Sequence, residues 1–444
     1  MTDKKVISID DQLEEVKKKQ ANQPKWQNKF IFKTNSKGEP EGIKTTARRN
    51  VLLILNHDPN LKGVFKYNKF TRNIDVTKNR TIDLSKQGVG IIKFTCGALK
   101  DADINNLGVY FEAYPSYHVI FKSQLIMDAL DVSARQHAYN PLVDYFEDAY
   151  KNWDHKARIS DFLPTYLGAA KNETNDLIIR QWLIGAVAKA YDPKTKFDLV
   201  LDLVGGQGAG KTTLLQKIAP LGLYTDQFST FTKVDDFEVM KNALIVNDDE
   251  MTASNKATFE ETKKFITMQF FDYRKAYGRL PEKFPKKFVI ARTSNEIAHL
   301  KDRSGDRRFM SILVNSKNQL KHPVNDLKPD YIKQLWGEAV WLYKNAKDPF
   351  ELTEHQQDLL VQNREEFKYT TEIEESLDDA LNQYYKNVDF IPTKKLAFKL
   401  YGTEDGFQMN RKDYQKVKYY MEHLGYKTAR KRIDGEITRG FKKV

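Results

Sequence analysis

Residues 199–218 read LVLDLVGGQGAGKTTLLQKI, and this stretch decides the fold of the central part of the chain. The apolar run 199–204 predicts a buried strand, and the spacing of apolar residues after Thr212 predicts a helix. Between them, residues 205–212 match the pattern G-x-x-x-x-G-K-[ST] in full. A phosphate-binding loop has this pattern in this strand–loop–helix context. The stretch therefore predicts a nucleotide site, and a glycine-rich turn that binds nothing is the alternative.

The predicted loop has the chemistry that phosphate groups require. Glycines let backbone N–H groups close around phosphate oxygens, and the N-terminus of the following helix adds a positive dipole. Lys211 is expected to neutralise the β- and γ-phosphates, and Thr212 is expected to hold Mg²⁺ through its hydroxyl. ATP and Mg²⁺ are thus the expected cofactors. The predicted nucleotide-binding residues are Gly205, Gly206, Gln207, Gly208, Ala209, Gly210, Lys211, Thr212 and Thr213.

An acidic run follows a second apolar strand, which is predicted at residues 242–247. It supplies two groups that phosphoryl transfer needs, a carboxylate on the metal side and a residue that orients water. We expect Asp249 in the first role, with Asp248 as the alternative, and Glu250 in the second. Ligands bind at the carboxyl ends of strands in open α/β sheets, which favours these roles over a solvated acidic turn.

A third apolar strand, predicted at residues 287–293, is followed by Ser294 and Asn295. Asn295 is expected to contact the γ-phosphate or the attacking water, although Ser294 or Asn295 could instead cap the next helix. Strands that alternate with helices predict a parallel sheet with crossover helices. In such a sheet the three strand ends converge on one site.

Two basic segments flank the third strand. Arg307 or Arg308 could serve as an arginine finger donated by a neighbouring subunit, or both could be surface arginines paired with Asp302 and Asp306. Residues 272–287 mix cations with aromatic rings, which suits single-stranded nucleic acid but also fits a basic surface hairpin. The predicted DNA-binding residues of this segment are Arg274, Lys275, Tyr277, Arg279, Lys283, Lys286 and Lys287.

The end of the chain carries most of the excess positive charge. The chain has 72 Lys+Arg against 60 Asp+Glu, a formal net charge of +12, which favours a polyanionic partner. About two-thirds of this excess falls in residues 391–444, the electrostatic footprint of duplex DNA binding. Helical patterns near 375–386, 392–401 and 411–424 precede a hairpin signal at Asp434-Gly435, which together predict a winged helix. The predicted DNA-binding residues are Arg411, Lys412, Lys416 and Lys418 on the third helix and Arg430, Lys431, Arg432 and Arg439 on the hairpin. A solubilising basic tail is the alternative.

Composition and pattern divide the 444 residues into six segments. With one cysteine, Cys96, no intramolecular disulfide is possible, and there is no signal peptide or run of 18 apolar residues, so we expect a cytoplasmic protein. Residues 107–121, rich in Tyr, Phe and Val, are expected to add a strand. The expected segments are an arm at 1–25, an α+β domain at 26–123, a helical domain at 124–192, an ATPase domain with a parallel sheet at 193–350, a linker at 351–370 and the basic winged-helix-like domain at 371–444.

Several motifs, in order along the chain, resemble those of virulence-associated protein E domains. The resemblance covers about residues 45–315, and its later motifs are the most specific. The matching motifs are Trp153-Asp154, Arg158-Ile159, Tyr166-Leu167-Gly168, Arg180-Gln181-Trp182-Leu183, the loop 205–212, Tyr273-Arg274, Tyr277-Gly278-Arg279, Thr293-Ser294-Asn295-Glu296 and Gly305-Asp306-Arg307-Arg308-Phe309.

The resemblance implies a replication protein of a mobile genetic element in a bacterial host. Such proteins are similar to superfamily 3 and AAA+ helicases, which form hexameric rings on DNA, so it implies an AAA+-like core, a finger at Arg307 or Arg308 that acts on the next subunit, and a DNA-contacting hairpin at 274–287. Some relatives carry a primase-polymerase module ahead of this region, for which little sequence precedes residue 45. We therefore expect a stand-alone, ATP-dependent DNA helicase or replication initiator, possible partners being a primase or other replication proteins. The alternatives are an initiator or regulator that uses ATP only as an assembly switch and, last, a small-molecule phosphotransferase.

Overall fold

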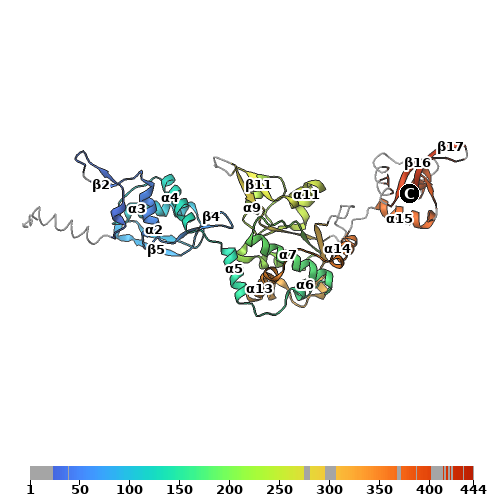
Figure 1. Cartoon of the computed structure of the whole chain (residues 1–444), viewed down its shortest axis with the longest axis horizontal. Coiled ribbons are helices and arrows are strands. Elements are labelled where there is room, and N and C mark those ends of the chain that lie inside the picture. The colour runs from blue at the N-terminus through green and yellow to red at the C-terminus, as the bar shows by residue number, and fades with distance from the viewer. Residues whose placement is uncertain are drawn as a thin grey trace, which may run out of the picture.

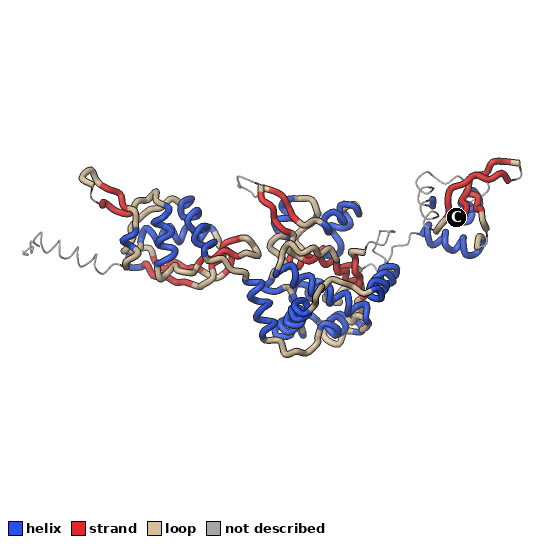
Figure 2. The backbone as a smooth tube through the Cα atoms, in the orientation of Figure 1, coloured by secondary structure: helices blue, strands red, loops and turns tan. Residues whose placement is uncertain are grey.

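A computed structural model gives the fold, and its helices and strands form three groups along the chain (Figure 1). Helices and strands are mixed within each group (Figure 2), which confirms the predicted mixed α/β class. In the part of the chain that is described, no helix is long and apolar enough to cross a membrane. The described residues are 24–38, 40–274, 281–295, 307–367, 372–386, 388–401, 414, 417–418, 421, 424–433 and 435–443.

The first group packs helices on small antiparallel sheets. Its core includes Val51, Leu107, Phe111 and Leu130, all of them fully buried. The strand predicted within 107–121 is wrong, because Leu107, Tyr110 and Phe111 recur at i, i+3 and i+4 and bury one face of helix α3. The elements are β1 (Phe32–Thr34), β2 (Pro40–Ile43), α2 (Arg48–His57), β3 (Phe65–Asn68), β4 (Asn73–Val76), β5 (Arg80–Leu84), β6 (Gly90–Phe94), β7 (Gly97–Ala98), α3 (Asp101–Ala113) and α4 (Ser123–Gln136).

A five-stranded sheet forms the centre of the second group, and every pairing in it is parallel. Its strands are β8 (Val200–Val204), β9 (Tyr224–Thr225), β10 (Ile245–Asp248), β13 (Val289–Ser294) and β14 (Phe309–Leu313), in the order β14-β8-β13-β10-β9. The three strands predicted from apolar runs are therefore present and parallel. Because β8 lies between β13 and β14, the glycine loop that follows β8 emerges between the carboxyl ends of two neighbours.

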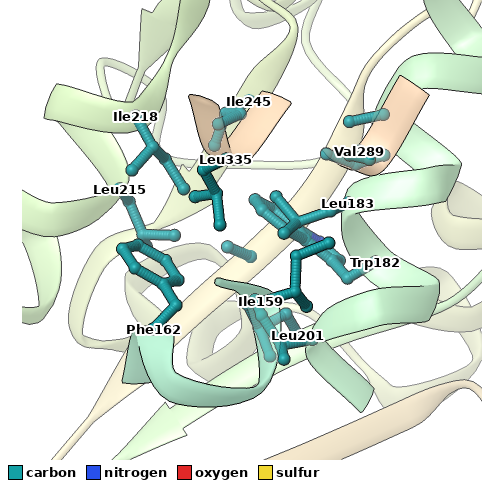
Figure 3. Packing of buried hydrophobic residues seen from close by; sticks show 14 of the residues in the cluster. Ile159, Phe162, Trp182, Leu183, Leu201, Leu215, Ile218, Ile245, Val289 and Leu335 are labelled. Atoms are coloured by element: carbon teal, nitrogen blue, oxygen red, sulfur yellow. The ribbon is translucent and has the colours of Figure 1, made fainter. Parts of the chain in front are cut away.

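Helices cover this sheet and fix its position. Helix α7 is buried over most of its length, and the indole N–H of Trp182 donates to the carbonyl of Ile290 in β13 at 2.9 Å. Figure 3 shows Trp182 and Leu183 of α7 in the same cluster as Leu201, Ile245 and Val289 of the strands. The helices of this part are α5 (Pro141–Lys151), α6 (Ile159–Leu167), α7 (Glu173–Tyr191), α8 (Lys211–Ile218), α12 (Pro323–Asp326) and α13 (Pro329–Asn345).

A stack of phenylalanines supports an excursion between β10 and β13. The rings of Phe271 and Phe288 are stacked, with Phe265 beside both. Strands β11 (Phe270–Tyr273) and β12 (Glu282–Pro285) pair antiparallel, so the predicted hairpin is present, whereas its tip lies outside the described residues. The helices ahead of it are α9 (Val234–Met240), α10 (Thr252–Lys256) and α11 (Phe259–Thr267).

The segment 351–370, expected to be a linker, is mostly a helix that packs on the sheet. Thr353 and Gln356 form a capping box that starts α14 (Glu354–Glu366). Leu360 is buried in the core beneath it, and the amide of Asn363 donates to the carbonyl of Ser311 on the edge strand β14 at 3.0 Å. The polar composition suggested a linker because only one narrow face of α14 is buried.

The last group has a small core of its own. Strands β15 (Phe390–Pro392), β17 (Glu436–Lys443) and β16 (Tyr426–Ile433) form an antiparallel sheet beside α15 (Glu372–Tyr384) and α16 (Thr393–Tyr401). The predicted hairpin is confirmed. Tyr414, Val417 and Met421 are helical and contact the core at the spacing of one helix face.

Candidate functional site

The glycine loop after β8 has a backbone that only glycine accommodates at its start. Gly205 has φ +149°, and a Cβ there would lie 2.3 Å from the carbonyl oxygen of Val314. Gly210, at the other end, has φ +81° and is the N-cap of α8. The loop is thus clamped against the end of β14, and α8 presents its N-terminus to whatever the loop encloses.

Lys211 is the first residue of α8, and its side chain lies inside the loop. It is 6% exposed, and its ammonium group donates to the carbonyls of Gly205 and Gly206 and to Oδ1 of Asn295 at 3.0 Å. Burial lowers the pKa of this ammonium, while the charges of Glu250 and Asp249 oppose that shift. The structure therefore brings Lys211 and Asn295 together, as the strand order requires.

Asp249 is the carboxylate that joins the strand ends. Its Oδ1 accepts hydrogen bonds from the hydroxyls of Thr212 at 2.6 Å and Thr293 at 2.7 Å, and from the amide of Asn247 at 3.3 Å. The carboxylate and the Thr212 hydroxyl are oxygen ligands of the kind that Mg²⁺ takes in phosphoryl-transfer sites. The donor set therefore fits the metal.

Asp248, the alternative, points elsewhere. It is 2% exposed, and its two oxygens accept from the backbone N–H groups of Ala253 and Ser254, both at 2.8 Å, and from the Ser254 hydroxyl at 2.6 Å. These bonds satisfy the first turn of α10, as a cap does. The geometry thus separates the two adjacent carboxylates, one facing the loop and the other the adjoining helix.

Glu250 faces the same site from a strained backbone. Its φ is +51°, a left-handed value that costs a residue with a Cβ roughly 1–2 kcal/mol. Its N–H donates to the Thr293 hydroxyl at 3.0 Å, and its carboxylate accepts from the Asn295 amide at 2.9 Å and 3.1 Å. The carboxylate itself is exposed and open to water. Backbone strain of this kind gathers at functional sites.

Thr293 and Asn247 were given no role from the sequence, yet they order the site. Thr293 is 1% exposed and holds both Asp249 and the backbone of Glu250 through one hydroxyl. Asn247 is fully buried, and its amide contacts Asp249. The signal that could have identified them is a polar residue near the carboxyl end of an otherwise apolar strand. The helix-cap alternative for Asn295 concerns residues after 295, which lie outside the described part.

A buried ion pair sets the register of the two strands behind the site. Arg292 of β13 lies opposite Asp202 of β8, and its Nε donates to Asp202 Oδ1 at 2.7 Å. The guanidinium also lies over the ring of Phe309, 4.1 Å from its centroid. This arrangement holds the strand that ends in Asn295 beside the strand that starts the loop.

The two candidate finger residues lie at the opposite end of the sheet. Phe309 directly follows Arg308 and pairs with Val200, the first residue of β8. The glycine loop begins after Val204, the last residue of β8. Five strand residues, about 16 Å, therefore separate Arg307 and Arg308 from the loop of the same chain. Arg307 is exposed, and Arg308 lies 3.9 Å from Asp198. Their proposed carboxylate partners Asp302 and Asp306 lie outside the described residues.

The basic segment 272–287 divides into exposed and buried cations. Arg274 and Lys283 are exposed on the hairpin. Lys286 is 1% exposed, donates to the carbonyl of Ile266, and burial lowers its pKa to about 7. Lys287 is 3% exposed, with its ammonium 4.3 Å from the ring centroid of Phe70.

The DNA-binding role predicted for Lys286 and Lys287 is therefore corrected, because neither side chain reaches the surface on which a strand would lie. Lys286 instead packs against α11, and Lys287 against Phe70, which lies between β3 and β4. The other predicted residues of this segment, Lys275, Tyr277 and Arg279, lie outside the described residues.

The C-terminal hairpin displays its predicted cations. Arg430, Lys431, Arg432 and Arg439 are exposed, and Arg430 lies directly opposite Arg439. Lys418 is partly exposed on the third helix. Arg411, Lys412 and Lys416 lie outside the part that the structure describes.

Comparison with known proteins gives a family and some structures of partial likeness. The apo structure of the NrS-1 C-terminal region is 15% identical, covers 86% of this chain and 96% of its own, and has a TM-score of 0.43. Two A-form apo structures of that region are each 18% identical, one covering 67% of this chain and 78% of its own with a TM-score of 0.41, the other covering 68% and 75% with a TM-score of 0.38. No curated protein matches. The model of the virulence-associated protein E-like domain matches residues 147–369, just over half of the chain, and the chain therefore belongs to this family.

Proposed function

We propose that this chain is an ATPase that couples hydrolysis to the unwinding of DNA during replication of a mobile genetic element. The observation that carries the proposal is the convergence of Lys211, Thr212, Asp249, Glu250 and Asn295 from three neighbouring parallel strands. A glycine loop, a cation, a metal-side carboxylate and a water-orienting carboxylate are the parts that a phosphoryl-transfer site requires.

Each side chain has a task that its contacts support. The loop N–H groups and Lys211 would hold the phosphates of ATP, and Asp249 with Thr212 would hold Mg²⁺, whose charge offsets that of the phosphates. Glu250, exposed and oriented by the Asn295 amide, would accept a hydrogen bond from the attacking water. Asn295 also accepts from Lys211 through its side-chain oxygen, so it contacts both the water-orienting carboxylate and the lysine that would hold the phosphates.

The position of the arginines supports an assembly with shared sites. Arg307 and Arg308 are a strand length away from the loop of their own chain, so they can complete only the site of a neighbour. In a closed ring with head-to-tail interfaces, each interface would combine the loop of one subunit with the arginine of the next. We propose such a ring, a hexamer by the family resemblance, with an AAA+-like core.

DNA contacts are proposed for two surfaces. Exposed Arg274 and Lys283 on the β11–β12 hairpin suit a single strand in the ring channel. On the C-terminal hairpin, Arg430 and Arg439 face each other, and like charges placed directly opposite destabilise a sheet unless an anion compensates them. If the C-terminal part is a winged-helix-like domain that binds duplex DNA through this hairpin, the DNA phosphates would supply that anion.

ATP-dependent separation of a forked DNA tests the proposal. Wild type should separate the strands, and Lys211→Ala should neither hydrolyse ATP nor separate them while still binding duplex DNA. Lack of hydrolysis by the wild-type oligomer in the presence of single strands would refute the motor function.

A mixing experiment tests the shared site. Lys211→Ala and the double variant Arg307→Ala/Arg308→Ala should each be inactive, whereas a random equal mixture should regain activity, because about a quarter of head-to-tail interfaces then pair an intact loop with an intact arginine. No recovery in mixed rings would contradict the transfer of the arginine between subunits.

The same incomplete site favours a second candidate, an initiator that uses ATP to lock an assembly without unwinding DNA. A loop and an arginine on opposite ends of the sheet would let bound ATP join two subunits even if it turned over slowly. Assembly that depends on ATP, together with no turnover stimulated by single strands, would favour this candidate over the helicase.

A further inference from the structure

A cavity of about 310 Å³ lies at the end of β14, and its lining residues were given no role from the sequence. Residues of the connection from α6 to α7 line it, as do residues of α14, the helix in the segment expected to be a linker. Its apolar lining includes Leu313, Leu359 and Phe367, and its polar lining includes Asn172, Thr174 and Asn363.

One connector joins this cavity to the phosphate loop. Leu313 ends β14 and residues 314–319 follow it, and Leu313, Asn315 and Asn318 line the cavity. Between them, the carbonyl of Val314 sits against Gly205, where the loop begins. Gln319, which follows Asn318, donates from its side-chain amide to the carbonyl of Ala209 at 2.6 Å, near the end of the loop. Because β14 and β8 are adjacent strands about 5 Å apart, a nucleotide whose phosphates occupy the loop can extend into the cavity.

The lining suits a flat heteroaromatic group with a polar edge. Leu313 is 46% exposed at the cavity, although its neighbour Ile312 in the strand is fully buried. An apolar side chain left open beside a concave polar wall is typical of a ligand site, where it packs on the face of a ring.

The polar wall also contains an unsatisfied acceptor. Asn363 is 8% exposed, its amide nitrogen is engaged by Ser311, and its Oδ1 is buried with no donor in the described structure. Buried acceptors of this kind are uncommon in folded proteins, and this one makes the wall beside Ser311 polar.

We propose that this cavity binds the base and ribose of the nucleotide, the base packing on Leu313 and its polar edge lying against the polar lining that includes Asn172 and Thr174. The inference rests on the proposed ATPase function and names the part of the substrate that the phosphate loop leaves unheld. It also gives α14 a role, since Leu359, Gln362 and Asn363 of α14 line the cavity.

Binding of two ligands by three variants tests the proposal. Ala170→Trp places a large side chain in the cavity, because Ala170 lines it and is exposed. Leu313→Ala removes the apolar wall, and Leu320→Ala is the matched control, an 82% exposed leucine just after the same connector that does not line the cavity. Calorimetric titration with Mg²⁺-ATP and with Mg²⁺-tripolyphosphate separates base contacts from phosphate contacts.

Ala170→Trp should weaken ATP binding about tenfold or more and Leu313→Ala about threefold, the size expected when an apolar wall is removed, while tripolyphosphate binding and the Leu320→Ala control stay at wild-type values. Unchanged ATP affinity in both cavity variants overturns the proposal. Equal weakening of ATP and tripolyphosphate overturns it as well, because the substitutions would then act through the phosphate loop. A wild-type chain that binds neither ligand refutes the nucleotide site itself, a result that the cavity variants alone cannot produce.

Discussion

Replacing Asp248 by Asn should destabilise the protein and spare hydrolysis, whereas replacing its neighbour Asp249 should do the reverse. The buried Asp248 carboxylate accepts three hydrogen bonds from Ala253 and Ser254. An amide keeps one acceptor and turns the other oxygen into a donor, which removes at least one bond to a charged acceptor. Such bonds contribute about 1.5–3 kcal/mol each, and a donor facing an N–H adds repulsion, so the cost is about 2–4 kcal/mol. The corresponding loss of thermal stability is on the order of 5–10 °C.

Asp249→Asn leaves the fold nearly unchanged, because the amide oxygen can still accept from Thr212 and Thr293. The change in the free energy of unfolding should stay within about 1 kcal/mol. The variant loses the negative charge that pairs with the metal, so hydrolysis should fall by about a hundredfold or more. Thermal melts and steady-state ATP hydrolysis on both variants measure the two effects. If Asp248→Asn abolishes hydrolysis without changing the melting temperature while Asp249→Asn stays active, the assignment of the two carboxylates is wrong.

Three further predictions concern charged residues outside the proposed nucleotide site. Burial lowers the pKa of Lys286 to about 7 from an ordinary value of 10.5, so the folded state binds fewer protons than the unfolded state between these values, and its stability rises with pH there. From pH 7 to pH 9, the free energy of unfolding measured by denaturation should rise by about 2 kcal/mol more for wild type than for Lys286→Met. The same change in both proteins would contradict the buried position of Lys286. The guanidinium of Arg72 donates to the carbonyl of Lys283 at 2.9 Å and lies over the Phe284 ring, so Arg72→Ala should speed hydrogen exchange in β12 several-fold without changing exchange in β8. Equal exchange in β12 of the two proteins would show that Arg72 does not stabilise this strand. Replacing Arg430 and Arg439 by Gln should lower the slope of log affinity for duplex DNA against log salt by about 0.9 for each phosphate that the hairpin no longer neutralises, whereas an unchanged slope would exclude the hairpin from the interface.

Features governed by neighbouring residues in the chain could be predicted from the sequence. The loop 205–212, the strands around it and the hairpin at Asp434-Gly435 each have a pattern that is complete within a few residues. That Asp249 and Asn295 lie close together could also be predicted, because parallel strands place their carboxyl ends side by side. Local pattern and one rule of topology were enough to bring these residues together.

Features governed by contacts between distant segments could not be predicted. The choice between Asp248 and Asp249 depends on which carboxylate faces α10, and two adjacent acids look alike in the sequence. Lys286 looks like a surface cation, yet its stem and ammonium are enclosed by a segment 20 residues earlier, where it bonds the carbonyl of Ile266. Helix α14 is polar on most of its surface, so its composition resembled a linker, and its buried face packs against β14 and α7.

The polarity of the parallel sheet explains why one chain would be insufficient for the proposed reaction. Every strand of the sheet runs the same way, so the glycine loop and the carboxylates gather at the carboxyl end of the strands, and the residues that precede the strands gather at the amino end. Arg308 directly precedes β14 at the amino end of the strands, 3.9 Å from Asp198. No side-chain rotation spans the strand length between the two ends, whereas a second copy whose amino end faces the first copy's loop would bring them together. Hydrolysis should therefore rise more steeply than linearly with protein concentration below the assembly threshold and linearly above it. Strict proportionality for a monomeric protein would mean that the arginines take no part in the reaction.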